Sequence, residues 1–233
     1  MHRVRALVPR PLRRLAPLAL LGLISMAGLA LAACDSGPHK PVASVRAVTL
    51  APGPHPVAVV RVKDLGEIRI ELLPEAAPQA VAQFEKLASE GFYDGTSFHR
   101  VIPGFMIQGG CPNTRNGDPR DDGKGGGEYA LEDEFSDLPH RRGAVSLANR
   151  GSRNTGGSQF FIMQDDVPSL DGKHTLFGRV VGGMEVVDAI TKLEIDKFGR
   201  YGPPDRPYPV SALVESVRIE APAPVAAAPA PAG

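Results

Sequence analysis

The sequence predicts a mainly β fold, in which antiparallel strands form a closed barrel and an α-helix packs at each end. The first observation is that short apolar-rich segments with the period of a strand recur along the middle of the chain. The second is that only two segments there place apolar residues at helical spacing. Many short strands with two isolated helices are typical of a barrel, because closure removes the exposed edge strands.

The first half of this region begins with two strands and a helix. Alternation of side-chain type predicts strands over residues 57–62 and 67–72. A helix is predicted from Pro78, which suits a first helical turn, to a stop at Gly91. Its apolar residues recur at helical spacing and would face a core: Val81, Phe84, Leu87 and Ala88.

A hairpin is predicted over residues 98–110, where two extended runs flank the turn signal Pro103-Gly104. Its arms would bring the guanidinium of Arg100 close to the side chains of Phe105 and Met106. An aromatic ring and a thioether beside a cation are more typical of a ligand pocket than of a core. From these residues alone, the alternative is an ordinary core hairpin with a surface arginine.

The second half of the region alternates loops with short elements. Residues 112–129 consist almost entirely of turn formers and charged residues and predict a long surface loop. The remaining predicted elements are strands over 144–148, 159–163, 176–181 and 213–219 and a second helix over 186–193.

The first 33 residues predict a lipoprotein signal peptide. An arginine-rich start precedes an apolar run from Leu15 to Ala33, which is the layout of a secretion signal. A transmembrane anchor is the alternative, because the run nearly reaches spanning length. The string Leu31-Ala32-Ala33-Cys34 favours the first, because it resembles the lipobox of bacterial lipoproteins, which is cut before the cysteine. We therefore expect a lipid on Cys34 that anchors the chain in the bacterial cell envelope, facing the periplasm.

Low-complexity segments flank the predicted domain at residues 57–220. Residues 34–56 are rich in Pro, Gly, Ser and Ala and predict a flexible tether that starts at the lipidated cysteine. Residues 221–233 predict a disordered Pro/Ala-rich tail. The one other cysteine, Cys111, then has no partner for an intramolecular disulfide and is expected to be a small buried residue.

Composition limits the partners. The 233 residues include 26 basic and 26 acidic side chains, so the formal net charge is zero. A nucleic-acid-binding protein would show a basic excess, and we expect no nucleic-acid partner. The length allows one domain with tails, which we expect to be a monomer.

Three parts of the sequence closely resemble signatures of the cyclophilin family of peptidyl-prolyl cis/trans isomerases. They are Phe98–Gly110, then Gly143–Asn149 with Gly157–Ile162, and finally Leu170–His174 with Phe177-Gly178. The resemblance covers residues 57–220 and implies an eight-stranded barrel capped by two α-helices. It also implies isomerisation of X-Pro bonds in proline-containing polypeptides without a cofactor.

The resemblance, carried over position by position, assigns the site residues. It implies that Phe105, Met106, Phe161 and Leu170 form a proline pocket with His174 at its edge. It further implies that Ala148, Asn149 and Gln159 bind the substrate backbone and that Gln108 holds Arg100 in position. Catalytic roles thus fall to Arg100, Gln108, Phe105 and His174. From the residues alone, either of the adjacent rings of Phe160 and Phe161 could face the ligand.

Other chemistries are disfavoured by spacing. His99, His140 and His174 lack the spacing of metal ligands, so we expect no metal. A serine hydrolase is disfavoured because the chain has no Gly-x-Ser-x-Gly motif and Ser158 has no evident base. The glycine-rich run Gly123–Gly127 lacks the spacing of a phosphate-binding loop.

Two functions remain open at this stage. One is an active isomerase that assists the folding of secreted or envelope proteins. The other is a chaperone module that binds proline-containing peptides with little turnover. Arg100 favours the first, because a guanidinium stabilises a twisted amide and binding alone would not need it. The sequence departs from animal cyclophilins at Ser169, where a tryptophan that contacts cyclosporin is typical, so we expect cyclosporin to bind weakly.

We predict that Cys34→Ser abolishes lipid attachment, because the cysteine thiol is the group that carries the lipid. Labelling with a fatty-acid analogue measures attachment, and mass spectrometry of the N-terminus measures cleavage. Cys111→Ser is the matched control, since it removes the other thiol of the chain and should label normally. Normal labelling and cleavage of Cys34→Ser would contradict the anchor assignment.

Overall fold

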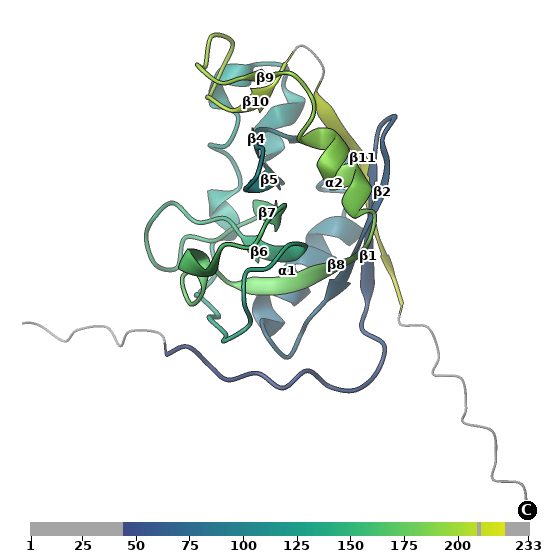
Figure 1. Cartoon of the computed structure of the whole chain (residues 1–233), viewed down its shortest axis with the longest axis vertical. Coiled ribbons are helices and arrows are strands. Elements are labelled where there is room, and N and C mark those ends of the chain that lie inside the picture. The colour runs from purple at the N-terminus through teal and green to yellow at the C-terminus, as the bar shows by residue number, and fades with distance from the viewer. Residues whose placement is uncertain (1–43, 209–210, 222–233) are drawn as a thin grey trace, which may run out of the picture. The chain divides into compact units, whose positions relative to one another are not determined.

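The principal structural feature is one antiparallel sheet that curls into a nearly closed barrel (Figure 1). The computed structural model describes residues 44–208 and 211–221, so Cys34, the signal segment and most of the C-terminal tail lie outside the described residues. The sheet consists of β1 Val57–Val62, β2 Gly66–Leu72, β3 Ser97–Phe98, β4 Arg100–Ile102, β5 Met106–Gly109, β6 Ala144–Leu147, β7 Phe160–Met163, β8 Leu176–Gly182 and β11 Ala212–Glu220. The helices are α1 Pro78–Ser89 and α2 Met184–Ile190.

The prediction of eight strands in a fully closed barrel was wrong in detail. The sheet has nine strands, in the order β3-β11-β1-β2-β8-β6-β7-β5-β4, and its two ends are not paired with each other. The extra strand arises because the predicted strand is interrupted at His99. Its first part, β3, pairs with β11, and its second part, β4, pairs with β5. The ends still meet in space, since only His99 separates β3 from β4 and its N–H donates to Gln108 O at 3.0 Å.

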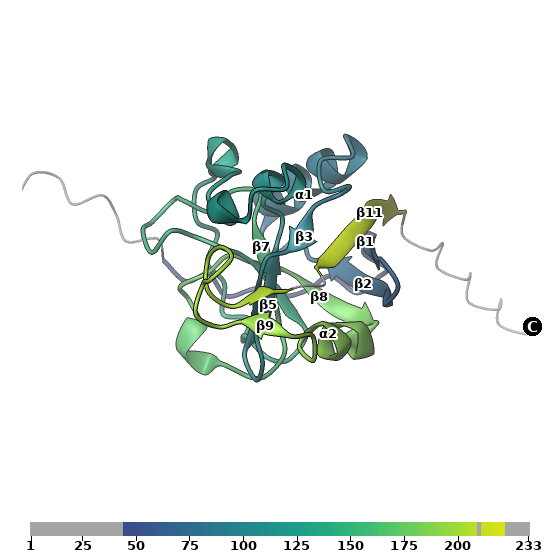
Figure 2. The same ribbon diagram turned by 90° about the horizontal axis from the view of Figure 1, so that it is seen from above.

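The core confirms the predicted periodicities. Ile68, Ile70 and Leu72 of β2 are completely buried, as a strand with one buried face requires. In α1 the four predicted apolar residues are buried, and Phe84 packs its ring 5.0–5.5 Å from the rings of Tyr93, Phe160 and Phe177. Figure 2 shows α1 and α2 on opposite sides of the sheet, so each covers one end of this core.

The beginning of α1 is stabilised by a distant residue. Ala77 at the N-cap has no side chain that accepts a hydrogen bond. The carboxylate of Glu134 accepts from the N–H groups of Gln79 and Ala80 at 3.1 and 2.9 Å, which satisfies two of the free donors of the first turn. A tertiary contact therefore replaces the local cap.

The long loop over 112–129 contains three short 3-10 helices, η1 Pro112–Arg115, η2 Pro119–Asp121 and η3 Gly127–Tyr129. Cys111 is buried at its start, as predicted, and its Sγ accepts from the N–H groups of Gly123 and Gly125 at 3.2 and 3.4 Å. The sequence did not predict the second sheet, in which β9 Ile195–Asp196 pairs with β10 Arg206–Pro207. A further 3-10 helix, η4 Pro168–Leu170, precedes β8.

Residues 44–56, which we call the strap, differ from the predicted flexible tether because they lie against the domain. Arg46 donates from its guanidinium to the carbonyl oxygens of Glu75 and Ala76 at 2.6 and 2.8 Å, and its N–H donates to Phe135 O at 3.0 Å. Val48 and Leu50 pack, half-buried, against a second apolar cluster that also contains Met106 and Phe161. Thr49, the residue between these two, is exposed, so Val48 and Leu50 point to the same side, toward the domain.

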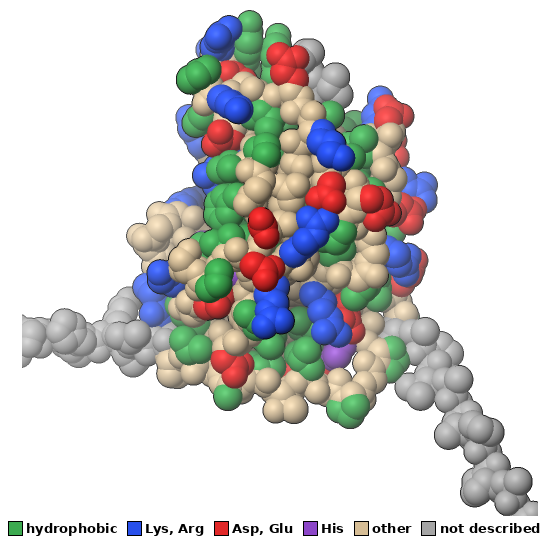
Figure 3. Space-filling view, viewed as in Figure 1, with side chains coloured by type: hydrophobic (Ala, Val, Ile, Leu, Met, Phe, Trp, Pro, Cys, Tyr) green, Lys and Arg blue, Asp and Glu red, His purple; other side chains and the backbone are tan. Residues whose placement is uncertain are grey.

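The surface shown in Figure 3 mixes basic and acidic side chains without a large area of one sign, in keeping with the zero net charge. Among the described residues, no helix has both the length and the apolar character that a bilayer span requires.

We predict that Val48→Ser combined with Leu50→Ser lowers the free energy of unfolding by about 2–4 kcal/mol, because two half-buried side chains lose apolar contacts. Urea unfolding measures the change. Ala47→Ser combined with Thr49→Ser is the control, since both residues are exposed, and it should leave stability unchanged. Equal stability of the two double variants would show that the strap does not contribute to the fold.

Candidate active site

A pocket of about 130 Å³ brings together all but one of the residues predicted for the proline site. Two of its walls come from the hairpin of β4 and β5, a third from β7, and the rest from the segments that follow β6 and precede β8. Gln159 lies just outside and contacts the pocket through Gln108. The lining residues are Arg100, Phe105, Met106, Gln108, Ala148, Asn149, Phe161, Leu170 and His174.

The structure shows which phenylalanine of β7 faces the pocket. Phe161 lines it, and Phe160 points to the opposite side, where its ring lies 5.5 Å from that of Phe84 in the core. The imidazole of His174 stands perpendicular to the ring of Phe161 at a centroid distance of 5.1 Å. Met106 and Phe161 are almost completely buried, so the floor of the pocket is apolar and closed.

The guanidinium of Arg100 lies at the mouth of this pocket, with its side chain 44% exposed. The family resemblance implied that Gln108 holds it, and the two residues are directly opposite each other in the β4–β5 ladder. The described residues show no hydrogen bond between them, and the amide of Gln108 donates instead to Gln159 Oε1 at 2.9 Å. The carboxylate within reach is Asp205, whose Oδ2 lies 4.0 Å from Arg100 Nε. At that distance most of the guanidinium donors stay available for a ligand.

A chain of amide hydrogen bonds joins the pocket to the loop over 112–129. Gln159 accepts from Gln108 and donates from its Nε2 to the carbonyl oxygens of Gly123 and Gly125, each at 2.8 Å. Each amide is thereby fixed in one orientation. The loop over 112–129 is thus attached directly to the residues that neighbour Arg100.

Sequence reasoning missed a buried polar network behind the pocket. The ring of His140 lies 2.9 Å from Asp171 Oδ1 through Nδ1 and 3.0 Å from Ser146 Oγ through Nε2, and it stacks on Phe161 at 6.2 Å. These residues belong to segments far apart in the chain, so only the fold reveals the network. Ser146 is completely buried and no substrate reaches it, which excludes a nucleophilic role in this arrangement. The network instead ties the segment that carries Leu170 to β6.

Burial favours the neutral form of both histidines near the pocket, because it lowers the pKa of each. It lowers the pKa of His174, although Leu147 O accepts a hydrogen bond from its Nδ1 at 3.2 Å. Burial also lowers the pKa of His140 against the opposing effect of Asp171. Within residues 44–208 and 211–221, no three His, Cys, Asp or Glu side chains gather as a metal site would require. The site therefore offers one exposed cation, neutral hydrogen-bonding groups and an apolar floor.

Comparison with known proteins identifies the family to which this chain belongs. The family described as "Cyclophilin type peptidyl-prolyl cis-trans isomerase/CLD" matches residues 57–215. Peptidyl-prolyl cis-trans isomerase B of Bacillus subtilis is 48% identical over 137 residues, which are 58% of this chain and 90% of that protein. A probable peptidyl-prolyl cis-trans isomerase of Brucella suis is 44% identical over 161 residues, or 67% of this chain and 82% of that protein.

A solved structure agrees with these sequence matches. The crystal structure of a cyclophilin-type isomerase of Cryptosporidium parvum, determined in the presence of the dipeptide Ala-Pro, superposes with a TM-score of 0.62 and 30% identity, covering 71% of this chain and 99% of that one. Fold and pocket thus define a proline-directed isomerase of the β-barrel type. The chain belongs to the cyclophilin family and is a peptidyl-prolyl cis-trans isomerase.

We predict that His99, the neighbour of Arg100, makes the protein less stable as the pH falls. His99 is 4% exposed, and burial lowers its pKa from 6.5 to about 4. Between these values the unfolded chain binds the proton and the folded chain does not, so stability is complete above pH 6.5 and falls on acidification. The full effect is of the order of 3 kcal/mol.

Unfolding in urea between pH 5 and pH 8 (about the range in which histidine titrates) measures this effect. His99→Gln should show a flatter pH dependence than the parent chain. His55→Gln is a control of opposite sign, because the hydrogen bond with Glu71 raises the pKa of His55. The stability that His55 contributes is therefore present at low pH and is lost as the pH rises. Parallel pH curves for His99→Gln and the parent would contradict the assignment.

Proposed function

We propose that Arg100 catalyses rotation about the X-Pro bond by stabilising the twisted amide. Resonance gives this C–N bond partial double-bond character, and the barrier is about 18–20 kcal/mol. In the twisted state resonance is lost and the nitrogen gains a free lone pair. A guanidinium at the pocket mouth donates to that nitrogen, or to the rotating carbonyl, more strongly than to either planar form, which is differential binding.

The energies are sufficient for this mechanism. Uncatalysed exchange at about 0.01 per second must rise to a typical turnover of about 10 per second, which requires about 4 kcal/mol. A hydrogen bond from a charged donor contributes about 1.5–3 kcal/mol. The apolar floor formed by Met106 and Phe161 adds to this, because the twisted amide is less polar than the planar one. No proton transfer and no cofactor enter the reaction.

The observation that supports this mechanism is the position of Arg100. Its guanidinium lines the pocket, yet its one carboxylate neighbour among the described residues is 4.0 Å away. A chaperone that only bound proline segments would need the apolar pocket and not the cation. We therefore favour turnover over passive binding, with the remaining lining residues placing proline and the substrate backbone as the family resemblance implies.

We further propose that the enzyme is a lipoprotein of the bacterial cell envelope that assists the folding of secreted or envelope proteins as a monomer. The lipobox-like string that ends at Cys34 supports this proposal, together with the arginine-rich and apolar segment before it. Two or more acyl chains on Cys34 would hold the chain stably at a bilayer. In that compartment, newly translocated chains refold with slow X-Pro steps that an isomerase accelerates.

We predict that Arg100→Ala keeps the fold and lowers kcat/KM by about 10- to 150-fold, the equivalent of one charge-assisted hydrogen bond. Arg100→Lys should also be poor, because a point charge does not reproduce the planar guanidinium. Proline-limited refolding and a short prolyl peptide provide the assays. Arg61→Ala, which removes an exposed arginine of β1 that pairs with Glu67 of β2, is the control and should be fully active. Parent-like catalysis by Arg100→Ala would rule out the mechanism.

A further inference from the structure

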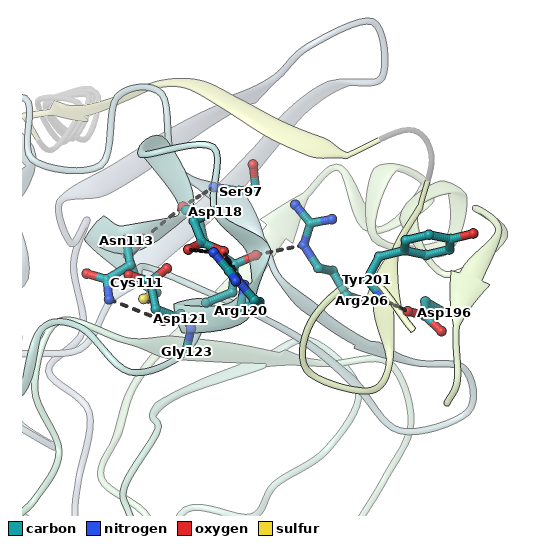
Figure 4. Close-up of polar contacts among 12 residues, drawn as sticks. Ser97, Cys111, Asn113, Asp118, Arg120, Asp121, Gly123, Asp196, Tyr201 and Arg206 are labelled. Carbon is teal, nitrogen blue, oxygen red and sulfur yellow. Dashed lines mark hydrogen bonds and ion pairs between the residues drawn. The ribbon is translucent and has the colours of Figure 1, made fainter. Parts of the chain in front are cut away.

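A second concave surface, the lateral groove, lies beside the proline pocket. It has a volume of about 1030 Å³ and runs between the loop over 112–129 and the hairpin over residues 195–208 that contains β9 and β10. The backbones of its two walls approach closely, since a Cβ on Gly202 would lie 2.6 Å from Pro119 O. Figure 4 shows residues from both walls. The groove is lined by Asn116, Gly117, Asp118, Pro119, Arg120, Lys124, Gly199, Arg200, Tyr201, Gly202, Pro203 and Tyr208.

Both walls are attached to the residues around Arg100. The hairpin is joined to β4, because Asp205 O accepts from the N–H of Val101 at 2.7 Å and its carboxylate faces Arg100. The loop over 112–129 is joined to the pocket through the side chain of Gln159. The walls are also joined to each other, since Arg206 Nε donates to Asp122 Oδ2 at 2.6 Å. A polypeptide whose proline occupies the pocket would therefore have the lateral groove within reach of its flanking residues.

The hairpin exposes apolar surface that the fold does not use. Tyr201 and Tyr208 stack at 4.2 Å with nearly parallel rings and remain 48% and 36% exposed, and Phe198 is 83% exposed. Three of the five large apolar side chains exposed in the described part of the chain thus lie within this one hairpin. Aromatic rings that keep a large exposed area at a concave surface are typical of binding sites.

The charge of the lateral groove is positive. Lys124 and Arg200 are exposed, and neither forms an ion pair with any described residue. The carboxylate among the lining residues, Asp118, is occupied by Arg120, which donates to it from Nε and Nη2 at 2.8 and 2.9 Å. A ligand therefore meets two unpaired cations beside a stacked pair of aromatic rings.

We propose that the lateral groove is a second docking site for client polypeptides, and that it selects an extended segment in which carboxylates accompany an apolar or aromatic side chain. The carboxylates would contact Lys124 and Arg200, and the apolar side chain would lie against Tyr201 and Tyr208. A polypeptide fits better than a membrane surface, because the tyrosine pair lines a concave surface between two walls, whereas a bilayer contacts convex surfaces. The proposal rests on the proposed isomerase function, since it concerns the residues that flank the isomerised proline.

The test compares two peptides on the full chain. The short peptide contains only the prolyl bond with its nearest neighbours, and the long peptide adds an acidic and aromatic segment, joined through spacers of increasing length. Lys124→Ala combined with Arg200→Ala should raise KM for the long peptide about tenfold at low salt, since two exposed charge contacts are lost. It should leave kcat unchanged for both peptides, and it should leave KM for the short peptide unchanged. High salt should reduce the difference, because exposed charges are screened.

Two controls make the result specific. Lys63→Ala combined with Lys86→Ala removes the same charge from exposed positions outside the groove and should have no effect on either peptide. A long peptide with lysine in place of each acidic residue should bind no better than the short one. Tyr201→Ala should raise KM for the long peptide without changing how that KM depends on salt. This result would separate the apolar contribution to binding from the electrostatic one.

The outcomes separate this proposal from the proposed function. If no peptide is isomerised by the parent chain, the isomerase function itself fails. If both peptides are isomerised and the Lys124/Arg200 variant has the parent's KM for the long peptide, the docking site is overturned while the isomerase function stands. Sedimentation with vesicles of anionic and of neutral lipid provides the last comparison. Loss of binding to anionic vesicles by the Lys124/Arg200 variant, with unchanged KM for the long peptide, would show a membrane contact instead and overturn the proposal.

Discussion

The structure depends on the two-residue period of the hairpin formed by β4 and β5. Val101 and Ile107 point into the barrel and are completely buried in its core. Their neighbours Arg100, Met106 and Gln108 point the other way and line the pocket. Because a slip of one residue would exchange the two faces, the packing of the core and the composition of the site fix the same register. The barrel therefore fixes the positions of the pocket residues that lie on β4 and β5.

Two apolar clusters stabilise the fold. The larger lies inside the barrel and includes Phe84 and its aromatic neighbours. The smaller lies beneath the pocket, contains Met106 and Phe161, and is covered by Val48 and Leu50 of the strap. The strap thus packs on the same cluster that forms the floor of the site. If Cys34 carries the anchor, the segment that leads from the membrane reaches the domain at this cluster.

Local patterns predicted most of the fold, the family resemblance predicted the residues of the pocket, and long-range contacts account for what both missed. Alternation and helical spacing were enough for β2 and α1, since these signals depend on neighbours in sequence. The break of the sheet at His99, the cap of α1 by Glu134 and the network of His140 each join residues that are distant in the chain. The choice between Phe160 and Phe161 needed the direction of the core, which alternation alone does not supply.

The hairpin over 195–208 contacts Arg100 through Asp205 and also forms one wall of the lateral groove. Asp205 lies far enough from Arg100 to leave guanidinium donors available, yet near enough to favour one orientation of that side chain. A direct bidentate pair would have occupied the donors that a twisted amide needs. Since the same hairpin also carries Tyr201 and Arg200, a ligand in the lateral groove and a proline in the pocket would contact one continuous structural unit. In the mechanism and the docking site that we propose, this one hairpin outside the barrel would contribute both to the selection of the client and to the orientation of the Arg100 guanidinium.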